Sequence, residues 1–395
     1  MRTAKLKDIT LTITDGKHGD CKNHDGSGYY FISCKDVYDE TIHYENARQI
    51  TEDDFRDADR RTNLAAYDIL ITNSGTIGRM ALVKDIPETR KTTFQKSVAI
   101  VRADTSQVVP NYLYYLLKSK VHDFINSSNG SAQKNLLLST MRDFDISFVD
   151  SFETQHRIAT ILSRYDSLIE NYQKQIKLLE EAAQRLYKEW FVDLHFPGHE
   201  NTNIIDGVPE GWEKKSIGEI GEYLNGFAFK PSDWQDLGKP IIKIKEMGNG
   251  VTNETPRNSG ERVPAKYLIK AGDLLFSWSA TLMVIIWSGE EGWLNQHLFK
   301  VTPVKGIDRE FLLQSISNAI VEFQNLTTGS TMKHIQRNKL NQVFVNVPNA
   351  EIMKRYSDIS EKTRSNILSL QSQLRLLTEA RDRLLPKLMN GEIAV

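Results

Sequence analysis

Apolar side chains recur along the middle of the chain with the alternating spacing of a coiled-coil seam. They stand four and then three residues apart between Glu153 and Trp190. The positions are Ile158, Leu162, Tyr165, Ile169, Tyr172, Ile176, Leu179, Ala183, Leu186 and Trp190. This spacing predicts one long helix whose apolar seam packs against a second helix.

A weaker copy of the seam lies near the C-terminus. Its positions are Tyr356, Ser360, Thr363, Ile367, Leu370, Leu374, Leu377, Arg381, Leu384 and Leu388, of which Ser360, Thr363 and Arg381 are polar. We expect this helix to end near Leu385, because Pro386 would break it. Both predicted helices exceed the average length of about 11 residues and carry charges on their other faces, so each seam is the natural partner of the other. Two unrelated helices, each packed on its own domain, are the alternative.

The two helices belong to an internal repeat that covers nearly the whole chain, which is a feature that sets the architecture. The segment AYDILI from Ala66 precedes GTIGRMALV from Gly75, and AGDLLF from Ala271 precedes SATLMVIIW from Ser279. The segment from Gly130 aligns with that from Gly329, and KLLEEAAQRL from Lys177 aligns with RLLTEARDRL from Arg375. The nearly constant offset indicates the order globular domain, helix, globular domain, helix.

Each globular domain is predicted to be mixed α/β. In the first, strands are expected at Tyr29 to Ser33, Ile69 to Thr72, Met80 to Val83 and Ser97 to Arg102, with a helix near Tyr112 to Phe124. In the second, strands are expected at Ile241 to Ile244, Leu274 to Trp278, Met283 to Trp287 and Leu298 to Thr302, with a helix near Phe311 to Phe323.

The predicted fold class is therefore mixed α+β, with an internal pseudo-two-fold repeat. Because each helix follows its own domain and returns the chain toward the other, the two helices should form an antiparallel coiled coil. A helix of about 36 residues, at about 1.5 Å per residue, is about 54 Å long. Such a spacer could hold two DNA readers roughly one turn of B-DNA, about 34 Å, apart.

The composition excludes some classes of protein but does not indicate a function. The chain has 50 basic and 51 acidic residues, so any argument for nucleic-acid binding must be local. The two cysteines are too few for a disulfide framework, and no apolar run is long enough to cross a membrane. We therefore expect a cytoplasmic protein without membrane contact.

Two segments at equivalent places in the repeat contain no acidic residue. One lies between Asp123 and Asp143, and the other runs from Phe323 to Ala350. A surface that faces phosphate excludes carboxylates, and amide and basic side chains can bond base edges, so both windows are candidate contacts to double-stranded DNA. The candidates within them are Ser131, Gln133, Lys134, Asn135, Thr331, Lys333, His334 and Arg337. Ser74, Arg79 and Trp278, in two predicted loops, are the next candidates; chance composition or a solubility effect is the alternative reading of the windows.

Enzyme chemistry has weak support. Gly75 to Gly78 is too short for a dinucleotide fingerprint, and no Asn-Pro-Pro-aromatic motif of an amino-methyltransferase occurs. His18, Cys21, His24 and Cys34 have an unusual spacing for zinc, so a surface loop is the default interpretation. A nuclease pattern can be forced onto Asp206 and Glu213-Lys214-Lys215 but is common by chance. We expect no catalytic residue, no metal and no cofactor.

An ordered set of motifs resembles one known family. The motifs are ITDGKHGD from Ile13, QHRIATILSRYD from Gln155, WFVDLHFPG from Trp190, VPEGW from Val208, GDLLFSWSAT from Gly272, LNQHLFKV from Leu294, GSTMKHI from Gly329 and LLPKLMNGEI from Leu384. From about Leu6 to the C-terminus, the chain resembles the specificity subunit of type I restriction-modification systems. Ser279-Ala280-Thr281-Leu282 replaces Gly75-Thr76-Ile77-Gly78 in the second domain, which puts in doubt any contact carried over from Arg79.

The resemblance implies two target-recognition domains, residues 1–150 and 196–348, and two spacer helices, residues 151–195 and 349–395. It implies that each domain reads half of an interrupted DNA sequence. It also implies that the helices dock two methyltransferase subunits and, through them, the restriction subunits, which combine helicase and nuclease. The residues expected at the helix interface are Ile158, Leu162, Tyr165, Ile169, Tyr172, Ile176, Leu179, Leu186, Ile367, Leu370, Leu374, Leu377 and Leu384. The competing hypothesis is an assembly adaptor whose globular domains bind protein.

Overall fold

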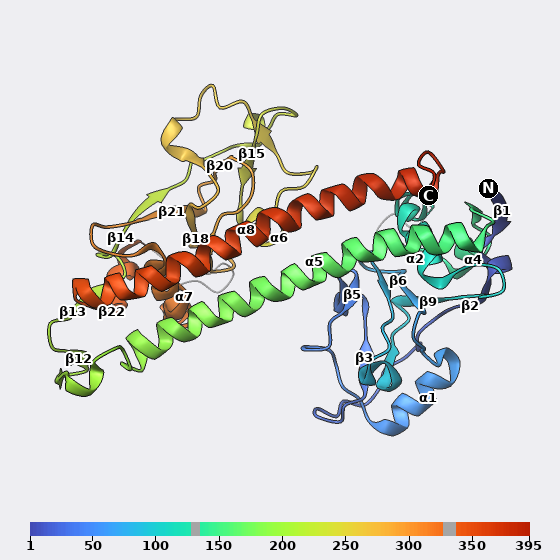
Figure 1. Ribbon diagram of the computed structural model, residues 1–395, viewed down its shortest axis with the longest axis horizontal. Coiled ribbons are helices and arrows are strands. Elements are labelled where there is room, and N and C mark those ends of the chain that lie inside the picture. The colour runs from blue at the N-terminus through green and yellow to red at the C-terminus, as the bar shows by residue number, and fades with distance from the viewer. Residues whose placement is uncertain (128–134, 327–336) are drawn as a thin grey trace. The chain divides into compact units, whose positions relative to one another are not determined.

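The computed structural model describes residues 1–127, 135–326 and 337–395 (Figure 1). These residues form two compact units. Unit 1 consists of Met1–Ile169 and Leu377–Val395, and unit 2 consists of Glu170–Leu376. Each unit therefore holds one globular domain and a part of both long helices.

A four-stranded antiparallel sheet lies at the centre of unit 1, in the order β2-β9-β6-β7. Its strands are β2 (Thr10–Asp15), β6 (Ile69–Thr72), β7 (Met80–Leu82) and β9 (Val98–Ala103). Ile69 and Ile71 pack in one core with the helix α2 (Pro110–Ser119), whereas Leu70 packs in another with Phe94. This alternation of consecutive residues is the two-residue period of a strand buried on both faces.

The remaining elements of unit 1 surround this sheet. They are the antiparallel pairs β1 (Arg2–Lys5) with β10 (Asp145–Phe148) and β4 (Val37–Tyr38) with β5 (Thr41–Ile42), the parallel pair β3 (Tyr30–Ile32) with β8 (Thr92–Phe94), and the helices α1 (Glu52–Thr62), α3 (Val121–Asn126) and α4 (Leu138–Arg142). The sequence predicted one helix near Tyr112 to Phe124, but the structure has two, α2 and α3. The break brings Phe124 against Phe144, with ring centroids 4.6 Å apart.

Unit 2 has the same central sheet, in the order β14-β21-β18-β19. Its strands are β14 (Gly221–Asn225), β18 (Leu274–Ser277), β19 (Met283–Ile286) and β21 (Leu298–Pro303). The helix α7 (Arg309–Asn325) follows β21 as α2 follows β9. The parallel pair β15 (Lys239–Ile242) with β20 (Gly292–Leu294) corresponds to β3 with β8.

The other elements of unit 2 are short. They are the strands β11 (Ile204–Ile205), β12 (Val208–Pro209), β13 (Glu213–Ser216), β16 (Arg257–Asn258), β17 (Leu268–Ile269) and β22 (Phe344–Val347), and the helix α6 (Ile244–Asn249). The pair β13 with β22 is antiparallel, as β1 with β10 is in unit 1.

Glycines at equivalent places allow a close approach of the backbone in both units. A Cβ atom on Gly16 would lie 2.0 Å from the carbonyl oxygen of Phe94, and one on Gly226 would lie 2.1 Å from that of Asn295. A side chain fits neither position, because a real Cβ never comes so close to another atom. The sequence repeat therefore extends to a shared backbone constraint.

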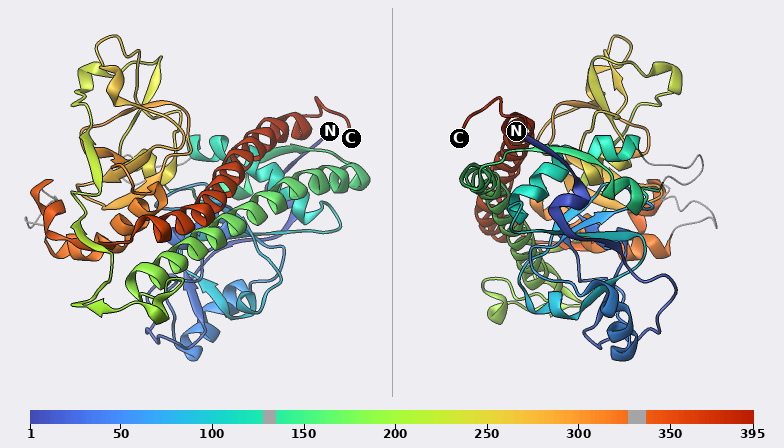
Figure 2. Two further views of the ribbon diagram at one scale, coloured as in Figure 1. Left: turned by 60° about the vertical axis from the view of Figure 1, so that its left-hand side comes forward. Right: turned by 90° about the vertical axis from the view of Figure 1, so that its right-hand side faces the viewer.

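The two long helices are α5 (Phe152–Tyr187), green in Figure 1, and α8 (Ala350–Met389), red in Figure 1. All seam positions named from the sequence are buried or half-buried. In unit 1, Leu385 and Leu388 of α8 share a core with Ile158 and Leu162 of α5, and both views of Figure 2 show these helix ends side by side. In unit 2, Trp190 and Tyr356 are in ring contact, with centroids 6.0 Å apart.

The expectation that Pro386 ends the second helix is wrong, because α8 continues to Met389. Leu385, Leu388 and Met389 are buried in the core of unit 1, and this packing holds the last turn in place. A proline inside a helix removes one backbone hydrogen bond at a cost of about 3 kcal/mol. Burial of three apolar side chains, at about 1.5–3 kcal/mol each, outweighs this cost. Among the described residues, no helix is both long enough and apolar enough to cross a membrane.

Candidate nucleic-acid interface

One end of the central sheet of unit 1 gathers several loops. The strands β2 and β6 end there, and β7 and β9 begin there, because neighbouring strands run antiparallel. The loop from Asn73 to Arg79 and the segment Gln95 to Ser97 therefore lie at this end. The backbone N–H of Asn73 donates to the carbonyl of Ser97 at 3.0 Å, which joins the two.

Two sequence candidates from distant segments meet at this loop. Ser74 and Asn135 form an isolated antiparallel bridge, and the N–H of Leu136 donates to the carbonyl of Asn73 at 2.8 Å. Asn135 is the first described residue after the interval 128–134, and its side chain is exposed. After the interval 128–134, the acid-free window of unit 1 thus resumes against the β6–β7 loop.

Arg79 is exposed at the end of this loop. Its backbone N–H donates to the hydroxyl of Thr72 at 2.9 Å, and that hydroxyl donates to the carbonyl of Thr76. The side-chain oxygen of Asn73 is buried without a hydrogen-bond partner among the described residues. A buried acceptor without a partner costs free energy unless water or a ligand satisfies it, so Asn73 joins the candidates although the sequence did not single it out.

Unit 2 has the same pair of hydroxyl hydrogen bonds across a shorter turn. The hydroxyl of Ser277 accepts from the N–H of Met283 at 2.9 Å and donates to the carbonyl of Thr281 at 2.5 Å. Thr72 and Arg79 are seven residues apart, whereas Ser277 and Met283 are six apart. Arg79 therefore corresponds to Met283, so the equivalent position of unit 2 carries no basic side chain.

Trp278 lies at the corresponding end of the sheet in unit 2. Its indole N–H donates to the side chain of Asn225 at 3.1 Å and to the carbonyl of Gln296 at 3.2 Å. The ring is half-buried, with its centroid 5.8 Å from that of His297. Trp278 thus forms part of a group of amide and aromatic side chains, and its indole N–H is engaged within the protein.

His297 lies in the same group. Its Nδ1 is 3.2 Å from the hydroxyl of Ser279, which is itself buried. Gln296 and His297 follow β20 as Lys96 and Ser97 follow β8, so the two units present different polar side chains at equivalent places. Different side chains at one structural position are what two readers of unlike base sequences require.

The other sequence candidates are only partly described. Arg337 is exposed and begins a 3-10 helix, Arg337–Gln342, that follows the second interval. Ser131, Gln133, Lys134, Thr331, Lys333 and His334 lie outside the described residues. All of these remain predictions.

Charged side chains beside the loops of unit 1 form ion pairs and hydrogen bonds with one another. The carboxylate of Asp15, at the end of β2, accepts from Arg61 at 2.7 Å and lies 2.9 Å from Nε2 of His18. Lys17 donates to Asp57 at 3.0 Å, and this hydrogen bond raises the pKa of Lys17 above its ordinary value. Lys17 is therefore a cation already paired with a carboxylate of α1.

The structure does not assemble the zinc-like set. Cys21 packs in a small core with Phe31, Ile50 and Phe55, whereas the backbone N–H of Cys34 bonds Ser97. Within the described part of the chain, no cluster of His, Cys, Asp and Glu could hold a metal ion. Burial raises the pKa of the Cys21 thiol, which opposes formation of a thiolate ligand.

A buried arginine on α8 bonds a carboxylate in each unit. In unit 1, Arg381 donates to Asp166 of α5 at 2.8 Å and to Glu40 at 3.0 Å. In unit 2, Arg364 donates to both oxygens of Glu310 of α7, at 2.8 and 2.9 Å. Burial opposes the charge of Arg381, but Glu40 and Asp166 together raise its pKa above the ordinary value. Neither pair was evident from the sequence, where Arg381 was only an interruption of a seam.

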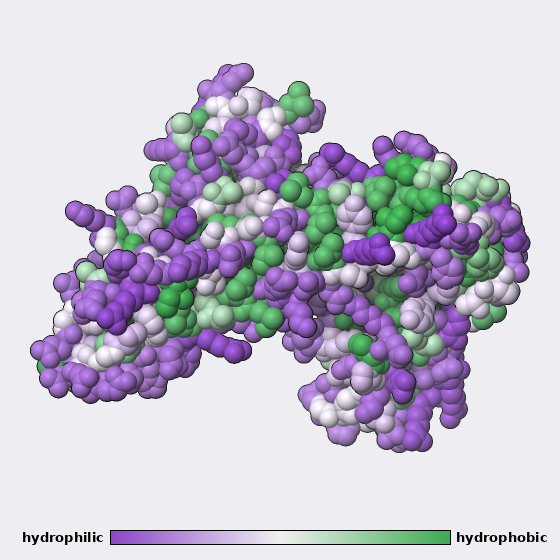
Figure 3. All heavy atoms as spheres, in the orientation of Figure 1, coloured by the Kyte–Doolittle hydropathy of each residue, from purple (hydrophilic) through white to green (hydrophobic). Residues whose placement is uncertain are grey.

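Both long helices also carry exposed apolar side chains. Leu168 and Leu178 of α5 and Ile359 and Leu376 of α8 are each more than 40% exposed. Figure 3 shows apolar side chains among polar ones along these helices. The two on each helix are ten and 17 residues apart, respectively, so they are single exposed side chains and do not by themselves form one apolar patch.

Comparison with known proteins assigns the family. The family described as "Type I restriction modification DNA specificity domain" matches residues 3–181 and 209–374. The chain therefore belongs to this family of DNA specificity proteins of type I restriction-modification systems.

Particular relatives agree with this assignment. The chain is 28% identical over 95% of its length to the type I restriction enzyme MjaIX specificity subunit of Methanocaldococcus jannaschii, of which 89% is covered. It is 24% identical over 74% of its length to the HindI specificity subunit of Haemophilus influenzae, of which 80% is covered. A crystal structure of the type I restriction-modification system S subunit from M. genitalium matches 98% of this chain and 96% of its own, with a TM-score of 0.57 and 16% identity, which supports the fold.

Proposed function

We propose that this chain is the non-catalytic specificity subunit of a type I restriction-modification complex and that its two globular domains read the two halves of an interrupted DNA site. The observation that carries the proposal is the double match to the DNA specificity family, one match on each repeat. Residues 1–150 and 196–348 would be the recognition domains, and residues 151–195 and 349–395 the spacers.

The DNA-reading surface would be the loop end of each central sheet. In unit 1 it includes Ser74, Arg79 and Asn135, where the acid-free window meets the β6–β7 loop. In unit 2 it includes the segment around Trp278 and the exposed Arg337. The two ends differ in their polar side chains, so two different half-sites would be read.

The long helices would form an antiparallel coiled coil that spaces the two domains, with a pseudo-two-fold relation between the repeats. The buried seam positions and the contacts of α5 with α8 within each unit support this arrangement. Specificity subunits work with methyltransferase and restriction subunits, so the helices would dock two methyltransferase subunits and, through them, the restriction subunits. The chain itself would bind no cofactor and would act in the cytoplasm.

The test is to map the DNA positions methylated in cells that carry the partner methyltransferase with and without this chain. We expect methylation at one bipartite sequence, two short half-sites separated by unspecified bases, only when this chain is present. Methylation of the same sites without the chain would contradict the proposal. Binding of the methyltransferase with no effect on its DNA targets would favour the assembly adaptor.

A further inference from the structure

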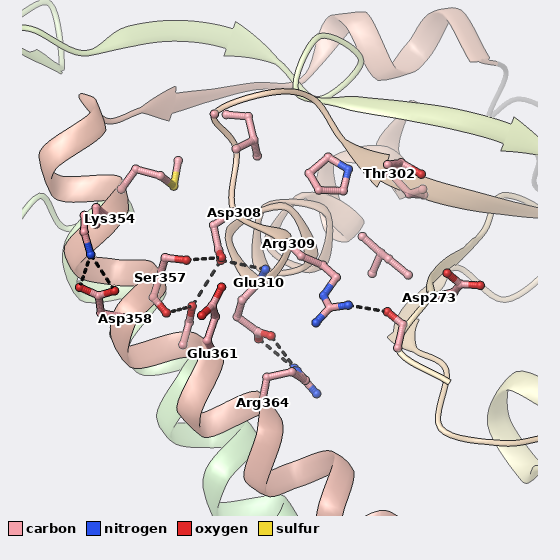
Figure 4. Close-up of a pocket in the computed structure, with 18 of the residues that line it drawn as sticks. Asp273, Thr302, Asp308, Arg309, Glu310, Lys354, Ser357, Asp358, Glu361 and Arg364 are labelled. Atoms are coloured by element: carbon pink, nitrogen blue, oxygen red, sulfur yellow. Dashed lines mark hydrogen bonds and ion pairs between the residues drawn. The ribbon is translucent and has the colours of Figure 1, made fainter. Parts of the chain in front are cut away.

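Each unit has a cleft at the same place in the repeat. In unit 1 it has a volume of about 250 Å³ and is lined by Tyr67, Asn111, His156, Thr160 and Ser163 among others. In unit 2 it has a volume of about 790 Å³ and is lined by Gly272, Glu310, Lys354, Asp358 and Glu361 among others (Figure 4). These residues correspond one to one in the order given.

The correspondence follows from the elements that carry the residues. Asn111 and Glu310 are each the second residue of α2 and α7. His156 and Lys354 are the fifth residues of α5 and α8, respectively. Thr160 and Ser163 are four and seven residues further on, as are Asp358 and Glu361. A cleft that occurs once in each repeat suits a partner that binds in two copies.

Tyr67 has a strained backbone at its place in the cleft. Its φ is 68°, in the left-handed region, whereas the corresponding residue is Gly272 with a φ of 93°. The turn is fixed in both units, since the N–H of Tyr67 donates to the carbonyl of Val83 at 2.8 Å and that of Gly272 to the carbonyl of Trp287 at 2.7 Å. A tyrosine is disfavoured at such a φ, and the residue is 56% exposed, so packing does not explain its presence.

The clefts lie away from the loops assigned to DNA. Tyr67 precedes β6 and Ser74 follows it, so the cleft and the loop are at opposite ends of one strand. Gly272 and Trp278 have the same relation to β18. A partner in either cleft would leave the loop end free, which favours a protein over DNA as the occupant.

The two clefts differ in charge. Among the described residues, no Asp, Glu, Lys or Arg lines the cleft of unit 1, which offers a phenol, an amide, an imidazole and hydroxyl groups. The cleft of unit 2 is lined by acidic and basic side chains, and Lys354 and Glu361 are exposed there (Figure 4). Ionic contacts of exposed groups weaken with salt, whereas aromatic contacts and neutral hydrogen bonds do not depend on it in this way.

We infer that these two clefts are the docking points of the two methyltransferase subunits, and that the cleft of unit 1 holds its copy by salt-resistant contacts centred on Tyr67 while the cleft of unit 2 holds its copy by salt-sensitive ionic contacts. The inference rests on the proposed function. It adds where each methyltransferase subunit docks and that the two copies differ in how strongly salt weakens their binding. The same partner surface can meet both clefts if its charged groups stay in water at the rim of the cleft in unit 1, since an unpaired charge is costly to bury.

The test counts the methyltransferase subunits bound to the full-length chain by native mass spectrometry while salt is raised. We expect two copies at about 0.1 M NaCl and one copy at about 0.5 M, where screening is much stronger. Tyr67→Gly should weaken the salt-resistant copy by about tenfold, as the loss of an aromatic anchor does, and leave the thermal unfolding midpoint unchanged, because glycine suits this φ. Lys354→Ala with Glu361→Ala should weaken only the salt-sensitive copy.

Asn63→Gly is the matched control, because Asn63 also has a left-handed φ, 42°, and is exposed in unit 1, but does not line the cleft. It should bind both copies as the unaltered chain does. Equal salt sensitivity of the two copies, or an unchanged affinity in Tyr67→Gly, would overturn the inference. Normal assembly with weaker DNA binding in Tyr67→Gly would also overturn it, by making DNA the occupant. Failure of the unaltered chain to bind any methyltransferase would instead contradict the proposed function.

Discussion

The guanidinium of Arg381 in α8 lies 2.8 Å from the carboxylate of Asp166 in α5, at a position where the α8 seam would otherwise carry an apolar residue. Arg381 also bonds Glu40 of the globular domain, and its side chain is only 7% exposed. A buried polar residue at a seam position is a known way to fix which helix pairs with which and in what register. Arg381 therefore joins both helices to the globular domain of unit 1.

Replacement of Arg381 by leucine should destabilise unit 1. The change leaves Asp166 without its cation, whereas Glu40 keeps Lys118 at 2.6 Å. Both carboxylates are about a quarter to a third exposed. We expect a loss of about 1–3 kcal/mol in the free energy of unfolding, below the about 3–5 kcal/mol typical of fully buried pairs, because water screens the two carboxylates. Urea unfolding followed by circular dichroism measures it.

Arg383→Leu is the control for this change, because Arg383 is 77% exposed and pairs only with Glu379 of its own helix in the described structure. Its loss should be below about 0.5 kcal/mol. Equal losses in the two variants would show that the Arg381 contacts contribute nothing beyond helix propensity.

The two close backbone approaches should tolerate no side chain. Gly16→Ala and Gly226→Ala place a Cβ 2.0 and 2.1 Å, respectively, from a carbonyl oxygen, far closer than van der Waals contact allows. We expect each variant to lose at least about 2 kcal/mol of stability, because backbone must move to relieve the clash. In Gly248→Ala the new Cβ meets only Met283 at 3.8 Å, so this control should be neutral or slightly stabilising. Thermal melts of the three variants decide the point.

The basic candidates should contribute to DNA binding by the assembled methyltransferase. Arg79→Ala, Arg337→Ala, Lys134→Ala and Lys333→Ala should each weaken binding and lower the slope of log affinity against log salt by about one unit for each phosphate interaction that the substitution removes. Arg90→Ala is the control, because it removes the same charge from an exposed position before β8, at the end of that strand away from the proposed DNA loops. It should change neither the affinity nor the salt slope. Unchanged slopes in all four variants would move the DNA surface elsewhere.

The isolated chain should carry no chemistry of its own. The sequence lacks the Asn-Pro-Pro-aromatic motif of an amino-methyltransferase, so we expect no heat of binding when S-adenosylmethionine is titrated into the pure subunit. Methylation and cleavage of DNA should likewise need the partner subunits. A measurable affinity for S-adenosylmethionine in the calorimeter would contradict this prediction.

Periodicity predicted the elements better than it predicted the contacts between them. The strand at Ile69 to Thr72 and both seams were evident, because burial on one face or both imposes a regular spacing of apolar residues. The α2–α3 break and the continuation of α8 past Pro386 were not, because tertiary packing of Phe124 and Leu388 decides them.

The functional site was less accessible from the sequence for a similar reason. The contact of Ser74 with Asn135 and the pairing of Arg364 with Glu310 join segments far apart in the chain, which no local pattern reveals. One signal was present in the repeat itself. Tyr67 aligns with Gly272, and a tyrosine at a position where the other copy has glycine points to a left-handed turn.

The central claim is that two DNA-reading domains are held apart by the helices α5 and α8. The most direct measurement inserts four residues beside Gln173, an exposed residue in the middle of α5, and maps the methylated sites with the partner methyltransferase. The insertion lengthens the helix by about 6 Å, and a coiled coil can absorb such a stutter by local unwinding. Because base pairs rise by about 3.4 Å, we predict that the gap between half-sites grows by about one to two base pairs while the half-sites stay the same. A change in the recognised bases with an unchanged gap would contradict the account.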